Sequence, residues 1–286
     1  NLAPGFRDAG EASLNVQLLV SLPKPEGFYD PDNPSGVPNR SESEEILEPQ
    51  DAPDALETGE EEVANEETQS DLAETPAEED EEDENADPRP SLLRFSNTDL
   101  LFSGNYLVAG NYHGFNTYDI SNPQAPMLLS SVVCPGGQGD VSLIGNLLIM
   151  SVQETRGRLD CGLAGVPDPV SEERIQGIRI FDVSDFSMPL QVGAVQTCRG
   201  SHTHTVVGPP NADNNAYVYV SGTSRVRDDE ELAGCSNDSP FENPESALFR
   251  IEVIEIPMDR PQDSKIVNRP FIFSDPETGV LAGLWE

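Results

Sequence analysis

The sequence predicts an all-β fold, a β-propeller of four-stranded antiparallel blades with three blades present as a partial ring. From residue 92 onward, short β-branched and aromatic runs of 5–8 residues alternate between apolar and polar positions, the pattern of strands. These runs recur with a period of roughly 40 residues and four strands per unit, which is typical of propeller blades.

The repeat is visible when two stretches are aligned with later ones. Asp99–Leu107 aligns with Asp140–Leu148, and Gly114–Ser121 aligns with Gly177–Ser184, so the second unit carries extra residues in its middle. The second unit has predicted strands at about 140–144, 147–152, 177–183 and 190–197. The predicted blades span about 96–133, 138–197 and 201–273.

Turn residues fit the same scheme. Gly104-Asn105 and Gly145-Asn146 lie between the first two strands of their units, where a tight hairpin needs positive φ. Asp119 to Pro123 and Asp182 to Asp185 lead from the third strand to the fourth, and their side chains are suited to cap that turn.

The charge of the chain is strongly negative and concentrated in one segment. There are 52 acids against 16 bases, a formal net charge of −36, which argues against sequence-independent binding to nucleic acid or to an anionic membrane. No apolar run reaches the roughly 18 residues of a membrane span. Residues 41–87 hold 22 acids and no Lys or Arg, so we expect an acidic disordered linker over 41–90. A solvating spacer and a weak calcium or cationic-partner tract both remain possible roles.

The two ends of the chain suggest a piece of a longer propeller. Residues 1–40 contain one strand-like run, Asn15–Leu22, and no initiator Met, as in a mature protein after signal removal or a cut fragment. The last residues, 283–286, fall where a further repeat would begin. We therefore expect residues 15–22 to serve as a closing outer strand of a last blade.

The units resemble LVIVD-repeat β-propellers, a bacterial group of mostly secreted or surface proteins without an assigned activity. The resemblance implies the propeller fold and export, and the acidic tract departs from it. The matching stretches are Asp99–Pro126, Gly157–Gly162, Gly177–Pro189, Cys198–Thr205, Ala247–Pro257 and the lead-in Asp8–Ala12.

Four cysteines allow three pairings. In a blade, the connection into the innermost strand and the connection between strands two and three lie on the same face of the ring. Cys134 and Cys198 precede innermost strands, while Cys161 and Cys235 lie in the strand-two-to-three insertions of the same blades, which favours Cys134–Cys161 and Cys198–Cys235. A Cys134–Cys198 pair and four unpaired thiols are the alternatives, and a Cys₄ zinc site is disfavoured because no C-x₂-C spacing occurs. Disulfides imply the periplasm, the cell surface or the medium.

His202 and His204 form an H-x-H pair at the start of the third innermost strand. On a strand the two rings project to one side, so they could hold Zn²⁺ or Cu²⁺ at the central channel if further ligands join them. The alternative is hydrogen bonding within a polar channel, satisfied by Thr203, Thr205 and water. Asp99 and Asp140 begin the other two innermost strands, where they either cap turns or add carboxylates near the channel.

Several charged residues concentrate on the rim that carries the insertions. We expect them either to bind a carboxylate or sugar acid, or to pair with Asp160, Asp228, Asp229 and Glu230 within the insertions. The predicted rim set is Arg156, Arg158, Asp160, Arg199, Arg225 and Arg227.

No hydrolase or phosphate-loop motif occurs. The sequence therefore favours an exported scaffold that binds a protein or glycan through its loop-bearing rim, with possible cell-envelope association. The alternatives are a metal-dependent redox enzyme with a His202/His204 site and a purely structural surface-layer component.

Overall fold

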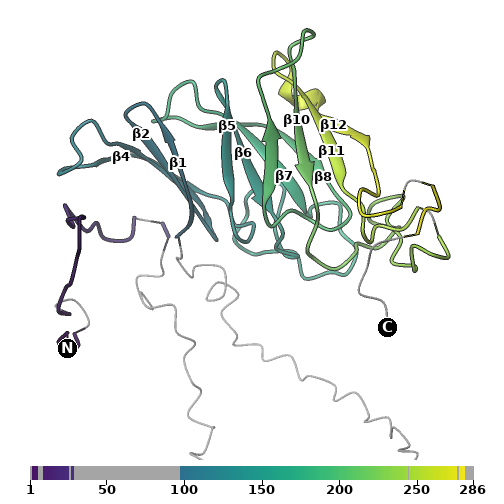
Figure 1. Ribbon diagram of the computed structural model, residues 1–286, viewed down its shortest axis with the longest axis horizontal. Coiled ribbons are helices and arrows are strands. Elements are labelled where there is room, and N and C mark those ends of the chain that lie inside the picture. Colours follow the sequence, from purple (N-terminus) through teal and green to yellow (C-terminus); the bar gives the residue numbers. More distant parts are fainter. Residues whose placement is uncertain are drawn as a thin grey trace, which may run out of the picture. The chain divides into compact units, whose positions relative to one another are not determined.

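The computed structural model describes residues 2–5, 9–25, 27–28, 97–243, 245–275 and 277–280. The predicted acidic linker at 41–90 and the last residues, 283–286, lie outside this part of the chain. The described residues form twelve strands and one short 3-10 helix, in three four-stranded sheets (Figure 1).

Blade one is an antiparallel meander in which each strand pairs with the next. It contains β1 (Asn97–Ser103), β2 (Tyr106–Asn111), β3 (Gly114–Asp119) and β4 (Met127–Val133). Gly104 has φ +58° in the β1–β2 turn, as the hairpin prediction requires.

Blade two repeats this arrangement with β5 (Val141–Ile144), β6 (Leu147–Val152), β7 (Gly177–Asp182) and β8 (Leu190–Gln196). These bounds confirm the four strands predicted for the second unit. Gly114 and Gly177 open the third strand of their blades with φ +136° and +145°. A Cβ at either position would lie within about 2 Å of a neighbouring backbone carbonyl oxygen, which explains the glycines.

Blade three contains β9 (His204–Val207), β10 (Asn215–Val220), β11 (Glu252–Pro257) and β12 (Lys265–Asn268), with the 3-10 helix η1 (Pro261–Asp263) before its last strand. One backbone contact recurs in all three blades. The carbonyl oxygens of Asn105, Asn146 and Asn214 accept from the N–H groups of Ile120, Val183 and Met258 at 2.7, 2.9 and 3.0 Å.

The blades pack face to face in chain order, and blade two is covered on both faces. One cluster joins Val108 and Phe115 of blade one to Leu148 and Met150 of blade two. The cluster on the other face joins residues of blade two to residues of blade three. Its buried members are Ile144, Leu147, Ile149, Ile178, Ile180, Val195, Ala216, Val218, Val220, Ile254 and Ile256. Each such side chain contributes roughly 1.5–3 kcal/mol when it leaves water.

The first strands β1, β5 and β9 neighbour one another from blade to blade. Sheets stacked in this way, with their first strands together, have the arrangement of propeller blades, so the all-β propeller prediction is confirmed.

Residues 15–22, the predicted closing strand, form no ladder with another strand of the described part, and Val16, Leu18 and Leu22 are exposed. The partner expected for this segment was a last blade beyond the three described here. The closing strand therefore stays a prediction.

Candidate functional site

The rim that carries the longest connections is the candidate site. The β2–β3 connection of blade one has two residues, whereas residues 153–176 (the first insertion) and 221–251 (the second insertion) occupy the same place in blades two and three. Cys134–Cys161 ties the first insertion to the segment entering β5, and Cys198–Cys235 ties the second to the segment entering β9. Both disulfides are the pairing that the blade topology favoured.

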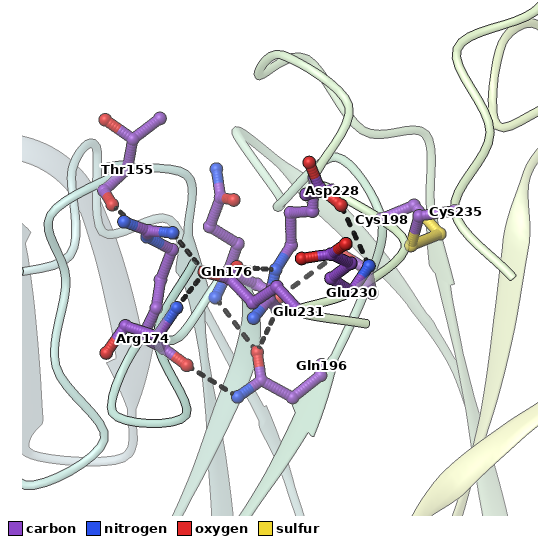
Figure 2. A network of polar contacts seen from close by, with 12 residues as sticks. Thr155, Arg174, Gln176, Gln196, Cys198, Asp228, Glu230, Glu231 and Cys235 are labelled. Carbon is purple, nitrogen blue, oxygen red and sulfur yellow. Dashed lines mark hydrogen bonds and ion pairs between the residues drawn. A yellow bond between two sulfur atoms is a disulfide. The ribbon is translucent and has the colours of Figure 1, made fainter. Parts of the chain in front are cut away.

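A buried ionic network joins the two insertions across the seam between blades two and three (Figure 2). Glu231, in the second insertion, has a side chain only 1% exposed. One carboxylate oxygen accepts from Arg227 Nε at 2.6 Å; the other accepts from the backbone N–H of Ser171 at 2.7 Å and from Arg174 Nη1. A carboxylate of blade three thus holds an arginine and a backbone amide of blade two.

The side chain of Arg174 extends this network within the first insertion. Its guanidinium donates to the carbonyl oxygens of Thr155 at 2.6 Å and Pro169 at 2.8 Å, and to that of Asp168. Gln196, on β8, donates to the Arg174 carbonyl at 2.7 Å and accepts from Arg227 Nη1. Because each charge is buried with several partners, the insertions are held as one surface rather than as separate loops.

The predicted rim arginines serve mainly as internal supports. Arg158 pairs with Asp160 at 2.8 Å and with Glu173 at 2.5 Å, and Arg156 pairs with Glu154 at 3.3 Å. The hydrogen bond from Arg158 lowers the pKa of Asp160 far below its usual range. Arg199 Nε donates to the Ser224 carbonyl oxygen at 3.0 Å.

Arg227 pairs with Glu231, four residues on, which was not among the acids expected to pair with the rim arginines. The Asp228 carboxylate instead accepts from the N–H of Glu230, and that of Asp229 accepts from the N–H of Gly234. These bonds stabilise the local turn and leave Glu231 to face Arg227. Arg225 is exposed, unlike the buried Arg227.

Asp99 and Asp140 link neighbouring blades, a role beyond the two that the sequence suggested for them. The Asp99 carboxylate accepts from the N–H of Val141 at 3.0 Å, and the Asp140 carboxylate accepts from the N–H of His204 at 2.9 Å. In each case the aspartate at the start of one inner strand holds the first residue of the next. Burial raises the pKa of Asp140, but hydrogen bonds from the side chain and backbone of His204 and from Asp99 outweigh it, so the pKa is lowered.

The two histidines do not share a strand face, because β9 begins only at His204 and His202 precedes it in a bend. The fully buried ring of His204 places Nδ1 2.8 Å from Ser151 Oγ and 3.0 Å from Asp140 Oδ2. His202 Nδ1 lies 2.6 Å from Gln153 Oε1. Thr203 and Thr205 are exposed.

Zinc or copper binding at this pair stays a prediction. Within the described ranges, no group of three or more His, Cys, Asp or Glu side chains is arranged to hold a metal ion. An open pocket of about 660 Å³ lies beside β5 and β9, and its lining is both apolar and polar, with Leu101, Leu143 and Val206 beside Ser142, His204 and Thr205.

Sequence reasoning missed Arg174, Gln196 and Glu231. The one local signal was the spacing of Arg227 and Glu231, four residues apart. The Arg174–Glu231 contact spans 57 residues and follows only from the stacking of blades two and three.

Comparison with known proteins adds little to this site. No protein family and no curated protein matches the chain. The crystal structure of the N-terminal domain of Nup159 is similar over 62% of this chain, with 10% sequence identity and a TM-score of 0.22. The alignment spans about half of that domain, 48%. In the part of the chain that the structure describes, no helix is long and apolar enough to cross a membrane.

Proposed function

We propose that this protein is a binding scaffold whose ligand-contacting surface is the rim formed by the first and second insertions. The observation that carries the proposal is the buried Arg174–Glu231–Arg227 network, which joins two long connections from different blades. A surface held in this way loses little conformational freedom when it binds a partner, so more of the contact energy remains as affinity.

The charge of this surface favours a basic partner. Three arginines of the insertions form ion pairs within the protein: Arg158 with Asp160 and Glu173, and Arg174 and Arg227 with Glu231. Their charges are therefore not available to bind an acidic ligand. Among the described residues of the insertions, the bases with exposed side chains are Arg225 and Arg156, the latter beside Glu154, while the exposed acids are Asp160, Asp168, Glu172, Glu173, Asp228, Asp229, Glu230, Asp238, Glu242 and Glu245. Of the protein and glycan ligands expected from the sequence, a basic protein surface fits this rim better than a sugar acid.

Two disulfides support an exported location, because such bonds persist in oxidising compartments. The partner would then be another exported or surface protein. An acidic rim meeting a basic partner predicts an association rate that falls as salt is raised.

The test is a binding screen of the full chain against basic exported proteins and a glycan array, followed by salt titration of any hit. The diagnostic variant neutralises four exposed rim acids together: Asp168→Asn, Glu172→Gln, Glu230→Gln and Glu242→Gln. The matched control, Asp213→Asn with Asp259→Asn, neutralises exposed acids in turns at the opposite end of blade three.

The proposal expects the rim variant to weaken binding at least about tenfold at low salt while the control binds as the wild type does. The proposal would be contradicted if the rim variant bound the partner with the affinity of the wild type, or if the screen found only neutral glycans as ligands.

A further inference from the structure

Each of the two disulfides has a buried arginine against one of its sulfur atoms. Arg179, on β7, places Nη1 3.5 Å from Cys161 Sγ, and Arg250 places Nη2 3.0 Å from Cys198 Sγ. Arg179 contacts the cysteine of the first insertion, whereas Arg250 precedes β11 and contacts the cysteine that leads into β9, and the charge balance of the two sites differs.

Arg179 is a buried cation without a carboxylate partner. It is 0% exposed, and its guanidinium donates to the carbonyl oxygens of Arg158 at 2.6 Å and of Leu159 and Pro135 at 3.3 Å. Among the described residues, no carboxylate lies within ion-pairing distance of it. Burial accordingly lowers the pKa of Arg179 to about 10, and the negative charge of Asp160 offsets only part of this effect.

The charge of Arg250, unlike that of Arg179, is balanced by a neighbouring carboxylate. Its Nη2 lies 3.1 Å from Glu252 Oε1, and both side chains are buried. Access to the sulfurs differs as well. Cys198 and Cys235 are 2% and 4% exposed, whereas Cys161 is only half-buried. The Cys134–Cys161 bond therefore combines a reachable sulfur with a buried guanidinium that forms no ion pair with a carboxylate of the described residues.

We propose that Cys134–Cys161 is a reducible disulfide and that Cys161 is a site of reversible modification by low-molecular-weight thiols, its thiolate pairing with Arg179. A thiolate next to a buried guanidinium supplies the anion that Arg179 lacks. Stabilising the reduced form in this way makes a disulfide easier to reduce.

The chemistry needs two equivalents of an external thiol. The first, as its thiolate, attacks Cys161 Sγ. The bond to Cys134 breaks, Cys134 leaves with the electron pair and takes up a proton, and a mixed disulfide remains on Cys161. The second thiolate attacks the small-molecule sulfur of that mixed disulfide and releases Cys161 as a thiolate beside Arg179. Two thiols are thereby oxidised to one small-molecule disulfide, and the protein disulfide is reduced by two electrons.

The test is a redox titration of the full chain in buffers of reduced and oxidised glutathione at pH 7, with acid quenching, alkylation and peptide mass spectrometry. Cys134–Cys161 is expected to open at a ratio of reduced to oxidised glutathione at least about tenfold lower than the ratio that opens Cys198–Cys235. Mixed disulfide with glutathione is expected on Cys161 rather than Cys134.

The variant Arg179→Gln should shift the reduction midpoint of Cys134–Cys161 about tenfold toward more reducing buffer. Arg179→Lys should shift it less, because the positive charge is kept. The midpoint of Cys198–Cys235 should be unchanged in both variants and serves as the internal control. In Cys134→Ser, Cys161 is a free thiol whose alkylation by iodoacetamide can be followed against pH. As the pH is lowered, this alkylation should slow at a lower pH in Cys134→Ser than in Cys134→Ser/Arg179→Gln.

If Cys134→Ser does not fold, as judged by circular dichroism, the wild-type titration decides alone. The proposal would be overturned if both disulfides opened at the same ratio of reduced to oxidised glutathione, or if Cys198–Cys235 opened first. An unchanged Cys134–Cys161 midpoint in Arg179→Gln would also overturn it.

Discussion

The carboxylate of Asp140 accepts a hydrogen bond from the backbone N–H of His204 at 2.9 Å and lies 3.0 Å from its ring Nδ1. Asp140 precedes the first strand of blade two, and His204 opens the first strand of blade three. The contact therefore fixes the inner edges of two blades to each other, as Asp99 and Val141 do one blade earlier.

Removing this carboxylate should loosen the seam between blades two and three. For Asp140→Ala we expect a loss of about 1.5–3 kcal/mol of stability, because a hydrogen bond to a charged, half-buried acceptor and the contact of that carboxylate with the His204 ring disappear. Urea unfolding followed by fluorescence measures the change. Asp259→Ala, which removes an exposed aspartate from a turn, should leave the midpoint near that of the wild type.

The same carboxylate gives the seam a dependence on pH. Because the folded-state pKa of Asp140 is lowered, its contribution is present above the unfolded value of about 4 and is lost as pH falls through the folded value. The difference in urea midpoint between wild type and Asp140→Ala should therefore be constant from pH 7 to about 5 and shrink below about 4. A difference that grows on acidification would contradict this role.

The buried triad predicts unequal effects from two adjacent glutamates. Glu231→Gln removes the charge that balances Arg174 and Arg227 and should cost about 3–5 kcal/mol. Glu230→Gln, which alters an exposed side chain, should change stability by less than about 0.5 kcal/mol. Thermal unfolding of both variants compares them directly, and equal effects would show that the triad is not a stabilising element.

The second disulfide should stabilise the chain independently of any redox role. Its cysteines are 37 residues apart, so the Cys198→Ser/Cys235→Ser double variant should lose about 3–4 kcal/mol, mainly through the freer unfolded chain. Guanidinium unfolding under non-reducing conditions gives the value. A loss below about 1 kcal/mol would mean that the second insertion is held without the bond.

The histidine pair can be tested for metal binding with the full chain. His202 and His204 each direct Nδ1 to a different partner, Gln153 for the first and Ser151 with Asp140 for the second. We therefore expect calorimetric titration with Zn²⁺ or Cu²⁺ to give the same result for the wild type and for His202→Ala/His204→Ala. A site present in the wild type and lost in the double variant would favour the metal-dependent redox enzyme instead.

The fold was predictable because its information is local. Alternating strands, the Gly104 and Gly145 turns and the repeat spacing lie within single blades, and the same topology placed each cysteine beside its partner. The contacts between blades could not be predicted. Glu231 meets Arg174 across 57 residues, and Asp140 meets His204 across 64, so both depend on how sheets stack. The sequence also did not single out Glu231 as the partner of Arg227, because the nearer acids Asp228 and Asp229 accept from backbone N–H groups of their own turn.

The central claim is that the first and second insertions form one surface joined through Glu231. Amide hydrogen exchange of wild type, Glu231→Gln and Glu230→Gln, read by mass spectrometry over residues 153–176 and 221–251, tests it most directly. We predict that Glu231→Gln speeds exchange in both insertions, including the N–H of Ser171, while Glu230→Gln leaves both as in the wild type. Faster exchange confined to 221–251, or no change in either insertion, would contradict the claim.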